Sequence, residues 1–184
     1  MAKVLVPTKI SAENVDALNR SGVCAEQLEN GDVLVCGVQS EDAKQKDVFA
    51  VTKPESAVAG LWMAYEPEVV DVIDGRNVYR GLNADPRSFV IPAGRTFSMF
   101  KPVEGVDLIQ ITKDFFAEDK DPATVTGATV VELNASGKWE AKVSATNNYA
   151  GMSWKIFAKK PIIIANGVIG GEGVDAWILE CAAN

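Results

Sequence analysis

From Gly31 onward, short segments alternate apolar and polar positions, and turn residues separate them at intervals of about ten, which is typical of antiparallel β-structure. The clearest segment is 138–144, where Trp139, Ala141 and Val143 share one face of an extended chain and polar residues occupy the other. A second apolar run, Val130 to Leu133, precedes it across the four-residue loop 134–137. The pattern predicts a β-hairpin here.

The same pattern predicts further short strands along the rest of the chain. Turn residues separate them at Asn30-Gly31, Asp74-Gly75, 92–94, Glu104-Gly105 and Gly170-Gly171. The expected strands are 32–38, 48–52, 69–73, 78–80, 88–91, 96–100, 106–112, 154–158, 162–165 and 174–181.

The first thirty residues do not follow this alternation. Residues Ser11 to Arg20 predict a short helix, because Ser11 is a favourable cap and Gly22 follows the last turn. Its apolar stripe is narrow, so we expect it to rest against a larger body. Ahead of it, Lys3 to Pro7 is expected to be an extended arm, since a residue before proline is disfavoured in helical conformation.

The fold class expected is therefore mainly β, an antiparallel β-sandwich or barrel with one short N-terminal helix and an extended N-terminal arm. We expect residues 1–29 to hold the arm and helix, and residues 30–184 to form the β-rich domain. The stretch 113–127 is strongly polar after two phenylalanines, which makes it the best candidate for an exposed loop or a boundary between two lobes.

Charge narrows the classes of partner. The chain of 184 residues has 25 acidic and 18 basic residues, a net charge of −7 that argues against a nucleic-acid-binding surface. The longest purely apolar runs, Val33 to Cys36 and Ile162 to Ala165, are far shorter than the roughly 20 residues of a membrane-spanning helix, so no membrane partner is expected. The start of the chain lacks the apolar core of a secretory signal, so we expect no export.

The residue inventory restricts the chemistry. There is no histidine, so Ser-His-Asp and Cys-His nucleophile arrangements cannot be built, and the usual zinc sites that contain histidine are missing too. The three cysteines, Cys24, Cys36 and Cys181, are widely spaced, and apolar runs surround the last two. We expect buried, reduced thiols and no disulfide framework.

Other candidate sites have simpler interpretations. The glycines of 167–173 lack the order of a dinucleotide-binding loop, so a flexible turn is favoured. The acids Glu118, Asp119 and Asp121 lack the pattern of a calcium loop and are expected to be solvated. Large aromatic residues dominate burial in small β-domains, so the four tryptophans are expected to be core or interface anchors. Glu66 and Glu68 beside Trp62 and Tyr65 are the nearest arrangement to a sugar-binding or hydrolase site.

Several segments in the middle of the chain resemble a known family. They are Asn30 to Gly37, Asp47-Val-Phe-Ala-Val, Ala64-Tyr-Glu-Pro-Glu-Val-Val, Tyr79-Arg-Gly-Leu-Asn and Phe89-Val-Ile-Pro-Ala-Gly-Arg-Thr-Phe. In this order they resemble tailed-phage head decoration, or cement, proteins, over roughly residues 28–115 and more weakly over 154–181. No functional residue can be carried over from that family.

The resemblance implies a virion structural protein that binds and stabilises an assembled capsid. It further implies the major capsid protein as partner, a homo-oligomer such as a trimer, a place on the capsid exterior after synthesis in the host cytoplasm, and neither catalysis nor a cofactor. The alternatives are a tail-tube or adaptor protein of the virion, and a carbohydrate- or small-molecule-binding β-module.

The N-terminal arm is the one segment predicted to bind a partner. Its residues Lys3, Val4, Leu5, Val6 and Pro7 could add a strand to the sheet edge of another protein. A strand that belongs to the protein's own sheet explains the same residues equally well.

Overall fold

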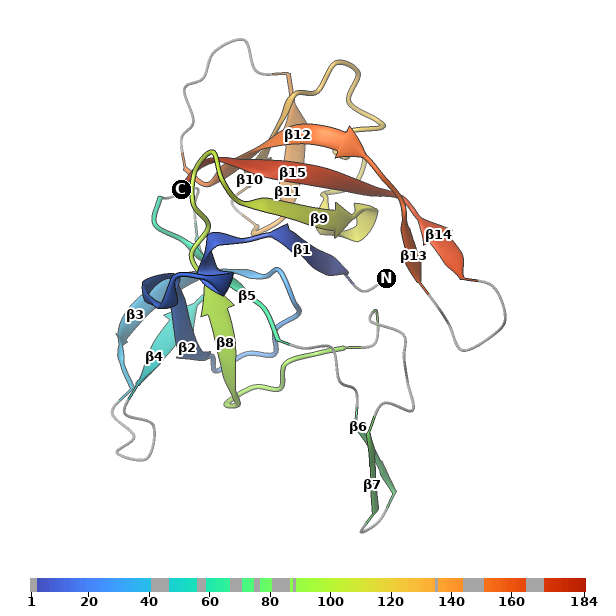
Figure 1. The fold of residues 1–184 in the computed structure, drawn as a ribbon. Coiled ribbons are helices and arrows are strands. Elements are labelled where there is room, and N and C mark those ends of the chain that lie inside the picture. The colour runs from blue at the N-terminus through green and yellow to red at the C-terminus, as the bar shows by residue number, and fades with distance from the viewer. Residues whose placement is uncertain are drawn as a thin grey trace.

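The fold is mainly β, as the alternation predicts (Figure 1). The structure is a computed structural model, and it describes residues 3–40, 47–55, 59–66, 71–74, 77–80, 87, 89–134, 136–143, 151–164 and 171–184. The described chain forms a six-stranded antiparallel sheet, a five-stranded closed barrel and two two-stranded ribbons.

The six-stranded sheet combines the first strand of the chain with the C-terminal half. Its strands run in the order β1-β9-β15-β12-β10-β11, and every neighbouring pair is antiparallel. The predicted hairpin is confirmed, with Val130 opposite Lys142 and Leu133 opposite Trp139. The strands are β1 (Leu5–Lys9), β9 (Leu108–Thr112), β10 (Val130–Leu133), β11 (Trp139–Lys142), β12 (Ser153–Lys159) and β15 (Ala176–Ala183).

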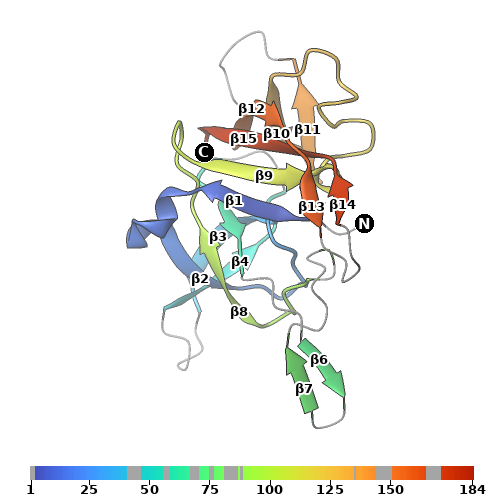
Figure 2. The ribbon, with the colours of Figure 1, turned by 45° about the vertical axis from the view of Figure 1, so that its right-hand side comes forward.

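The barrel is built from residues 19–100 and lies against the sheet (Figures 1 and 2). It closes in the order β2-β4-β3-β5-β8, and β2 and β4 are its one parallel pair in the described residues. Alternation predicted three of these strands, but β2 and β5 were missed. The strands are β2 (Asn19–Val23), β3 (Val33–Gln39), β4 (Val48–Thr52), β5 (Trp62–Ala64) and β8 (Thr96–Phe100).

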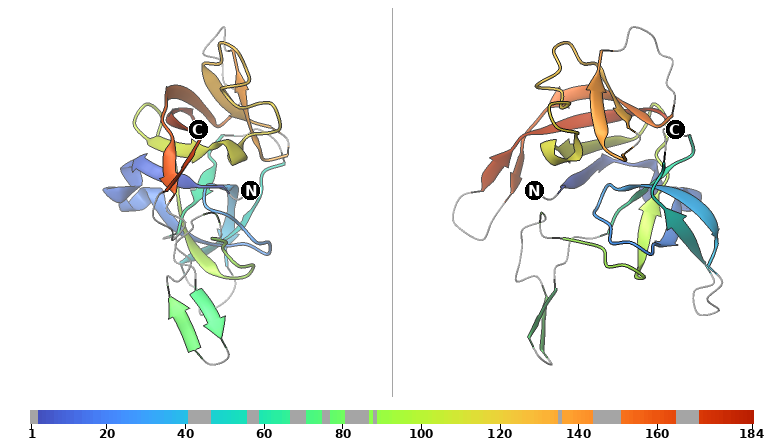
Figure 3. Two further views of the ribbon diagram at one scale, coloured as in Figure 1. Left: turned by 90° about the vertical axis from the view of Figure 1, so that its right-hand side faces the viewer. Right: turned by 180° about the vertical axis from the view of Figure 1, so that it is seen from behind.

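Two ribbons extend from this body. The ribbon of β6 (Asp71–Asp74) and β7 (Asn77–Arg80) stands apart from the sheet and barrel in every view (Figures 1 to 3). The other ribbon pairs β13 (Ile162–Ile164) with β14 (Glu172–Val174) beside the end of the large sheet. The predicted strand 174–181 is thus two strands, separated at Asp175.

The predicted helix Ser11 to Arg20 is wrong. Two 3-10 turns, η1 (Ser11–Glu13) and η2 (Asp16–Leu18), replace its first part, and β2 replaces its end. Ser11 does not cap a helix, because its hydroxyl donates a 2.7 Å hydrogen bond to Asp107. Val15 is extended, with φ −127° and ψ 100°, so helical hydrogen bonding cannot continue through it. A third 3-10 turn is η4 (Lys113–Phe115).

Gly22, expected to stop that helix, instead lies inside β2 opposite Phe97. A Cβ atom added to Gly22 would lie 3.0 Å from the Phe97 ring. The barrel interior therefore requires a small residue at this position.

One buried cluster joins the sheet to the barrel. It contains Leu5 and Ile109 from the sheet together with Val33, Met63 and Phe100 from the barrel. Trp139, Trp154 and Trp177, exposed by 2% or less, belong to the same cluster, as predicted for core anchors. A second cluster, which includes Trp62 and Phe97, fills the barrel itself. The sheet and the barrel thus share apolar packing and are not merely tethered.

The predicted domain boundaries at residues 29/30 and near 113–127 stay predictions. The chain passes between sheet and barrel elsewhere, through residues 10–18 after β1 and 101–107 after β8.

Candidate functional site

The segment predicted to bind a partner, Lys3 to Pro7, pairs with the protein's own sheet. Leu5 lies opposite Ile111 and Val6 opposite Gln110 in β9. Val4 and Leu5 are only 2% and 1% exposed, whereas Val6 is 39% exposed. Two of the five residues are therefore committed to the core, and partner binding by the remainder stays a prediction.

Pro7 affects the outer edge of this strand. Thr112 N–H donates to the Val4 carbonyl, and backbone groups alternate along a strand, so the backbone of Pro7 is directed away from β9. Proline has no N–H to offer there. Strand addition at this edge loses a hydrogen bond at Pro7, which is how edge strands often avoid unwanted pairing.

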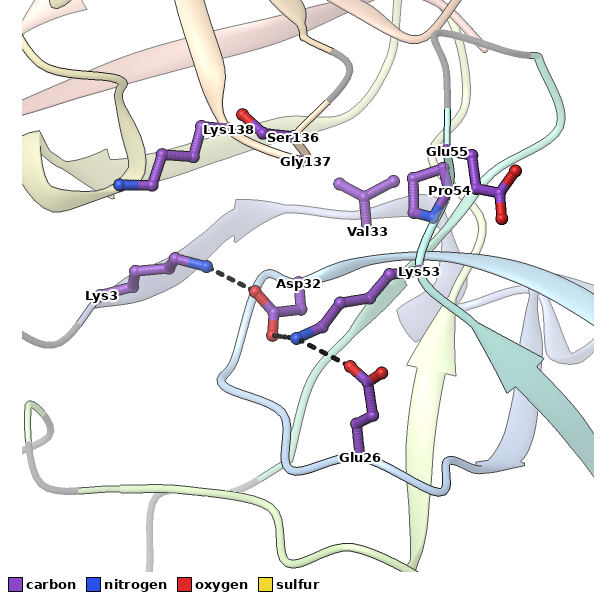
Figure 4. A pocket seen from close by; sticks show the side chains of 10 residues that line it. All are labelled: Lys3, Glu26, Asp32, Val33, Lys53, Pro54, Glu55, Ser136, Gly137 and Lys138. Carbon is purple, nitrogen blue, oxygen red and sulfur yellow. Dashed lines mark hydrogen bonds and ion pairs between the residues drawn. The ribbon is translucent and has the colours of Figure 1, made fainter.

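A charged cleft of about 430 Å³ lies where Lys3 meets the barrel (Figure 4). One wall carries Ser136 to Lys138, from the β10–β11 turn, and the opposite wall comes from the barrel. The lining residues are Lys3, Glu26, Asp32, Val33, Lys53, Pro54, Glu55, Ser136, Gly137 and Lys138.

Asp32 is the centre of this cleft. Its carboxylate accepts hydrogen bonds from the Lys3 ammonium at 2.5 Å and from the Glu29 backbone N–H at 3.0 Å. The Lys53 ammonium lies 4.0 Å away and also pairs with Glu26 at 3.6 Å (Figure 4). Two lysines, one from each side of the cleft, therefore compensate a carboxylate whose side chain is only 9% exposed.

The cleft brings Lys3 together with residues that sequence reasoning missed. Asp32 and Lys53 lie 29 and 50 positions from Lys3 in the sequence. Asp32 precedes β3 and Lys53 follows β4, so both lie at the open end of this antiparallel hairpin, and no spacing rule relates them to Lys3. The ion pair between Lys3 and Asp32 anchors the start of the chain to the barrel. The hydroxyl of Ser136 donates to Asn134 at 2.8 Å, and the lining presents no nucleophile with a neighbouring base.

The stretch 113–127 is a loop with exposed residues such as 118–120, as expected, but two aromatic side chains hold it to the body of the protein. Phe115 is 1% and Phe116 5% exposed, so both side chains anchor the loop to the core. The Ala117 N–H donates to the Trp139 carbonyl at 2.9 Å, and the Ala141 N–H donates to the Lys120 carbonyl at 2.8 Å. The loop therefore covers the outer edge of β11 and protects it from pairing with another chain.

Asp121 in this loop is 1% exposed, against the expectation of a solvated acid. Burial alone raises the pKa of its carboxyl, but hydrogen bonds from the Thr124 hydroxyl and the Ala123 N–H, together with the Lys113 ammonium, outweigh burial and hold the pKa below its usual value. Its oxygens are thus occupied by the turn. Within the described residues, no three acidic or cysteine side chains come together as a metal site.

The neighbourhood of Trp62, the alternative sugar-binding position, is filled by the protein itself. Trp62 is 5% exposed, and the Arg20 guanidinium lies 4.8 Å from the centre of its ring. Glu66 accepts a hydrogen bond from the Ser98 N–H, and Glu68 lies outside the described residues. The predicted turn at 167–173 also lies largely outside them.

The three cysteines are free, as predicted. Cys24 and Cys181 are buried, whereas Cys36 is half-buried and receives a 3.5 Å contact from the Arg20 guanidinium. Burial, reinforced by the carboxylates of Asp107 and Glu104, raises the pKa of the Cys181 thiol to about 12.

No known protein family, curated protein or solved structure shows a significant match to this chain. Among the helices of the described residues, none is long and apolar enough to cross a membrane.

Proposed function

We propose that this protein is a virion structural protein that binds an assembled phage capsid and stabilises it without catalysis. Its partner is the major capsid protein, and it occupies the outside of the capsid after synthesis in the host cytoplasm. It acts there as a homo-oligomer, with a trimer as the expected form. This proposal extends the resemblance in the middle of the chain to the whole protein.

The observation that supports the proposal best is the buried cluster shared by sheet and barrel. Leu5 and Ile109 from the sheet pack with Val33, Met63 and Phe100 from the barrel, and the Lys3–Asp32 ion pair joins the same two parts. A rigid body with separate surfaces on its two parts can contact neighbouring subunits of a shell at once. Bridging of this kind stabilises the assembled shell over separate subunits.

Modest energy per copy is sufficient for this function. Each protein that binds only the assembled shell shifts the equilibrium towards assembly by mass action. The equivalent sites of a capsid repeat that gain many times, and an oligomer adds avidity through its linked copies. A covered sheet edge at β11 is useful in such a protein, since an open edge would promote filaments of the protein itself.

The test is addition of the purified protein to undecorated phage heads. We expect saturable co-sedimentation with the heads and a higher temperature of head disruption, monitored by release of packaged DNA. An unrelated acidic β-protein of similar size is the control for non-specific protection. Failure of the protein to bind any undecorated head would contradict the proposal.

The same preparations distinguish the alternatives. Rings or tubes of the purified protein in negative-stain images would favour a tail-tube or adaptor protein. Binding to a glycan array that is lost in the variant Trp62→Ala, while the variant remains folded, would favour a carbohydrate-binding module.

A further inference from the structure

A groove of about 850 Å³ separates the β13–β14 ribbon from the loop that follows β9. Its two walls diverge from one backbone hydrogen bond, in which the Lys113 N–H donates to the Asp175 carbonyl at 3.0 Å. Phe116, 5% exposed, contributes an apolar surface to the lining. The groove thus lies between two segments that this hydrogen bond joins.

One wall of the groove is the edge of β14. Four consecutive residues, 172–175, line it, whereas a strand that presents a face would contribute every second residue. In the part of the chain that the structure describes, β14 pairs only with β13, on its other side. A ribbon of two strands is marginally stable, and a third strand along its free edge would stabilise it.

Gly173, in the middle of this edge, is a glycine that the fold does not require. Its φ lies outside the left-handed region, and a Cβ atom added there would have no neighbour within 4 Å. By contrast, a Cβ atom at Gly171 would lie 2.4 Å from the Ile163 side chain. Glycine within a strand often marks the close approach of another backbone. Gly173 thus leaves room for another backbone to approach β14 closely.

The charges of the groove select the kind of strand. Asp114, Glu118 and Asp119 line the loop wall, and none of the three forms a salt bridge with another described residue, so their carboxylates can receive a cation. Of the three cations in the lining, two are already paired, Arg87 with Glu172 at 3.0 Å and Lys113 with Asp121 at 3.4 Å, which leaves Lys138 against the three carboxylates of the loop wall. An excess of carboxylates remains beside the open strand edge.

We propose that this groove binds an extended, lysine- or arginine-bearing segment of another protein. The segment adds to β14 as the third strand of the ribbon, runs beside Gly173 and places its basic side chains near Asp114, Glu118 and Asp119. Main-chain hydrogen bonds supply affinity, and the acidic wall supplies selectivity. If the proposed function holds, the segment belongs to the capsid shell. The source of the segment rests on that function, whereas binding by the groove does not.

The test uses synthetic peptides and the intact protein. The probe is a fluorescein-labelled octapeptide of alternating lysine and threonine, compared by fluorescence anisotropy with its glutamate analogue and with a fully N-methylated version. We expect the lysine peptide to bind saturably and more weakly as salt is added. Both comparison peptides should bind at least tenfold more weakly. Equal binding of either one, or no binding of the lysine peptide, would overturn the proposal.

Two variants locate the binding. Gly173→Val replaces the glycine that allows close approach of another backbone with a branched side chain, and it favours the extended conformation of β14. The protein should therefore unfold at the wild-type temperature or above while peptide affinity falls at least tenfold. Ile163→Thr is the matched control, since Ile163 lies opposite Gly173 on β13, away from the groove, and should bind the peptide normally. Wild-type affinity in folded Gly173→Val would refute the assignment. Should that variant unfold, Asp114→Asn/Glu118→Gln/Asp119→Asn tests the same groove by loss of salt-dependent binding.

Binding to undecorated heads separates this inference from the proposed function. Peptide binding without head binding would leave the groove established and reject the capsid role. If the wild-type protein fails to bind the lysine peptide, while wild type and Gly173→Val bind heads equally well, the capsid role stands and the groove proposal is rejected.

Discussion

The ammonium of Lys3 lies 2.5 Å from the carboxylate of Asp32 and joins the start of the sheet to the start of barrel strand β3. The Asp32 side chain is only 9% exposed and that of Lys3 19%, so this ion pair is better shielded from solvent than described surface pairs such as Lys159–Asp175. Lys3 also lies 5.6 Å from the centre of the Phe115 ring. The start of the chain is thus held by the Lys3 ion pair, just before β1, and by burial of the Val4 and Leu5 side chains.

Removal of the Lys3 ammonium should destabilise the protein. Lys3→Met leaves the buried Asp32 carboxylate with the Glu29 N–H and, as the one remaining cation among the described residues, Lys53 at 4.0 Å, so we expect the free energy of unfolding to fall by about 1–2 kcal/mol. Lys53→Met is the control, because Lys53 is 47% exposed and its loss should cost less than about 0.5 kcal/mol. Urea unfolding monitored by tryptophan fluorescence measures both. Equal losses would show that Lys3 has no special role.

Gly31→Ala should be far more damaging than an alanine at another left-handed glycine. Gly31 has φ +85°, and a Cβ atom there would lie 2.6 Å from the Phe115 ring, which is 1% exposed and cannot move aside. We expect a loss of about 2–4 kcal/mol from strain and overpacking together. Gly94→Ala isolates the backbone effect, since Gly94 has φ +71° but open space, and should cost about 1 kcal/mol. Similar thermal denaturation of the two variants would contradict this view.

Alternation is clearest in strands with one face in the core, such as β11. In the hairpin, Trp139 and Ala141 are buried and Lys142 is exposed, so the period of two is visible in the sequence. Strand β5 escaped prediction because all three of its residues are buried, which removes the alternation. Strand β2 was not predicted because the Ser11 to Gly22 stretch has local helix signals. The hydrogen bond from Ser11 to Asp107 and the pairing of β2 with β8, both distant in sequence, outweigh those signals.

The charged cleft and the groove could not be predicted from the sequence for a different reason: their residues are distant in the chain and meet only in the fold. Asp32 and Lys53 meet Lys3 only because β1 joins a sheet whose other strands follow the barrel in the chain. Likewise, Gly173 and Asp119 line one groove through the pairing of β9 with β15. The acidic loop was recognised as polar, but its buried Asp121 depends on hydrogen bonds that composition does not reveal.

Asp121 should make stability depend on acid pH. Its carboxyl has a pKa below the unfolded value of 3.8, so its contribution is present above that pH and is lost as the pH falls through the folded value. Asp121→Asn should therefore cost about 1–2 kcal/mol at neutral pH, when the wild-type carboxylate is ionised. The difference from wild type should narrow below pH 3.8. Urea unfolding from pH 6 to 2.5 measures the gap, and a gap that stays constant would disprove the linkage.

The thiols should differ in reactivity. In the native protein, a disulfide reagent such as DTNB at pH 8 should modify Cys36 alone, because Cys24 and Cys181 are buried. The pKa of Cys181 is raised to about 12 from 9.0, so this thiol favours the folded state below pH 9 and the advantage declines as the pH rises towards 12.

Two variants test these expectations about the thiols. Cys36→Ser should abolish the rapid reaction, and Cys181→Ala should lose less stability than wild type between pH 8.5 and the pKa of about 12. Mass spectrometry of the labelled protein identifies the modified residue, and urea unfolding gives the alkaline dependence. Rapid labelling of Cys181 in the folded protein, or an identical alkaline loss in Cys181→Ala, would show that burial does not control this thiol.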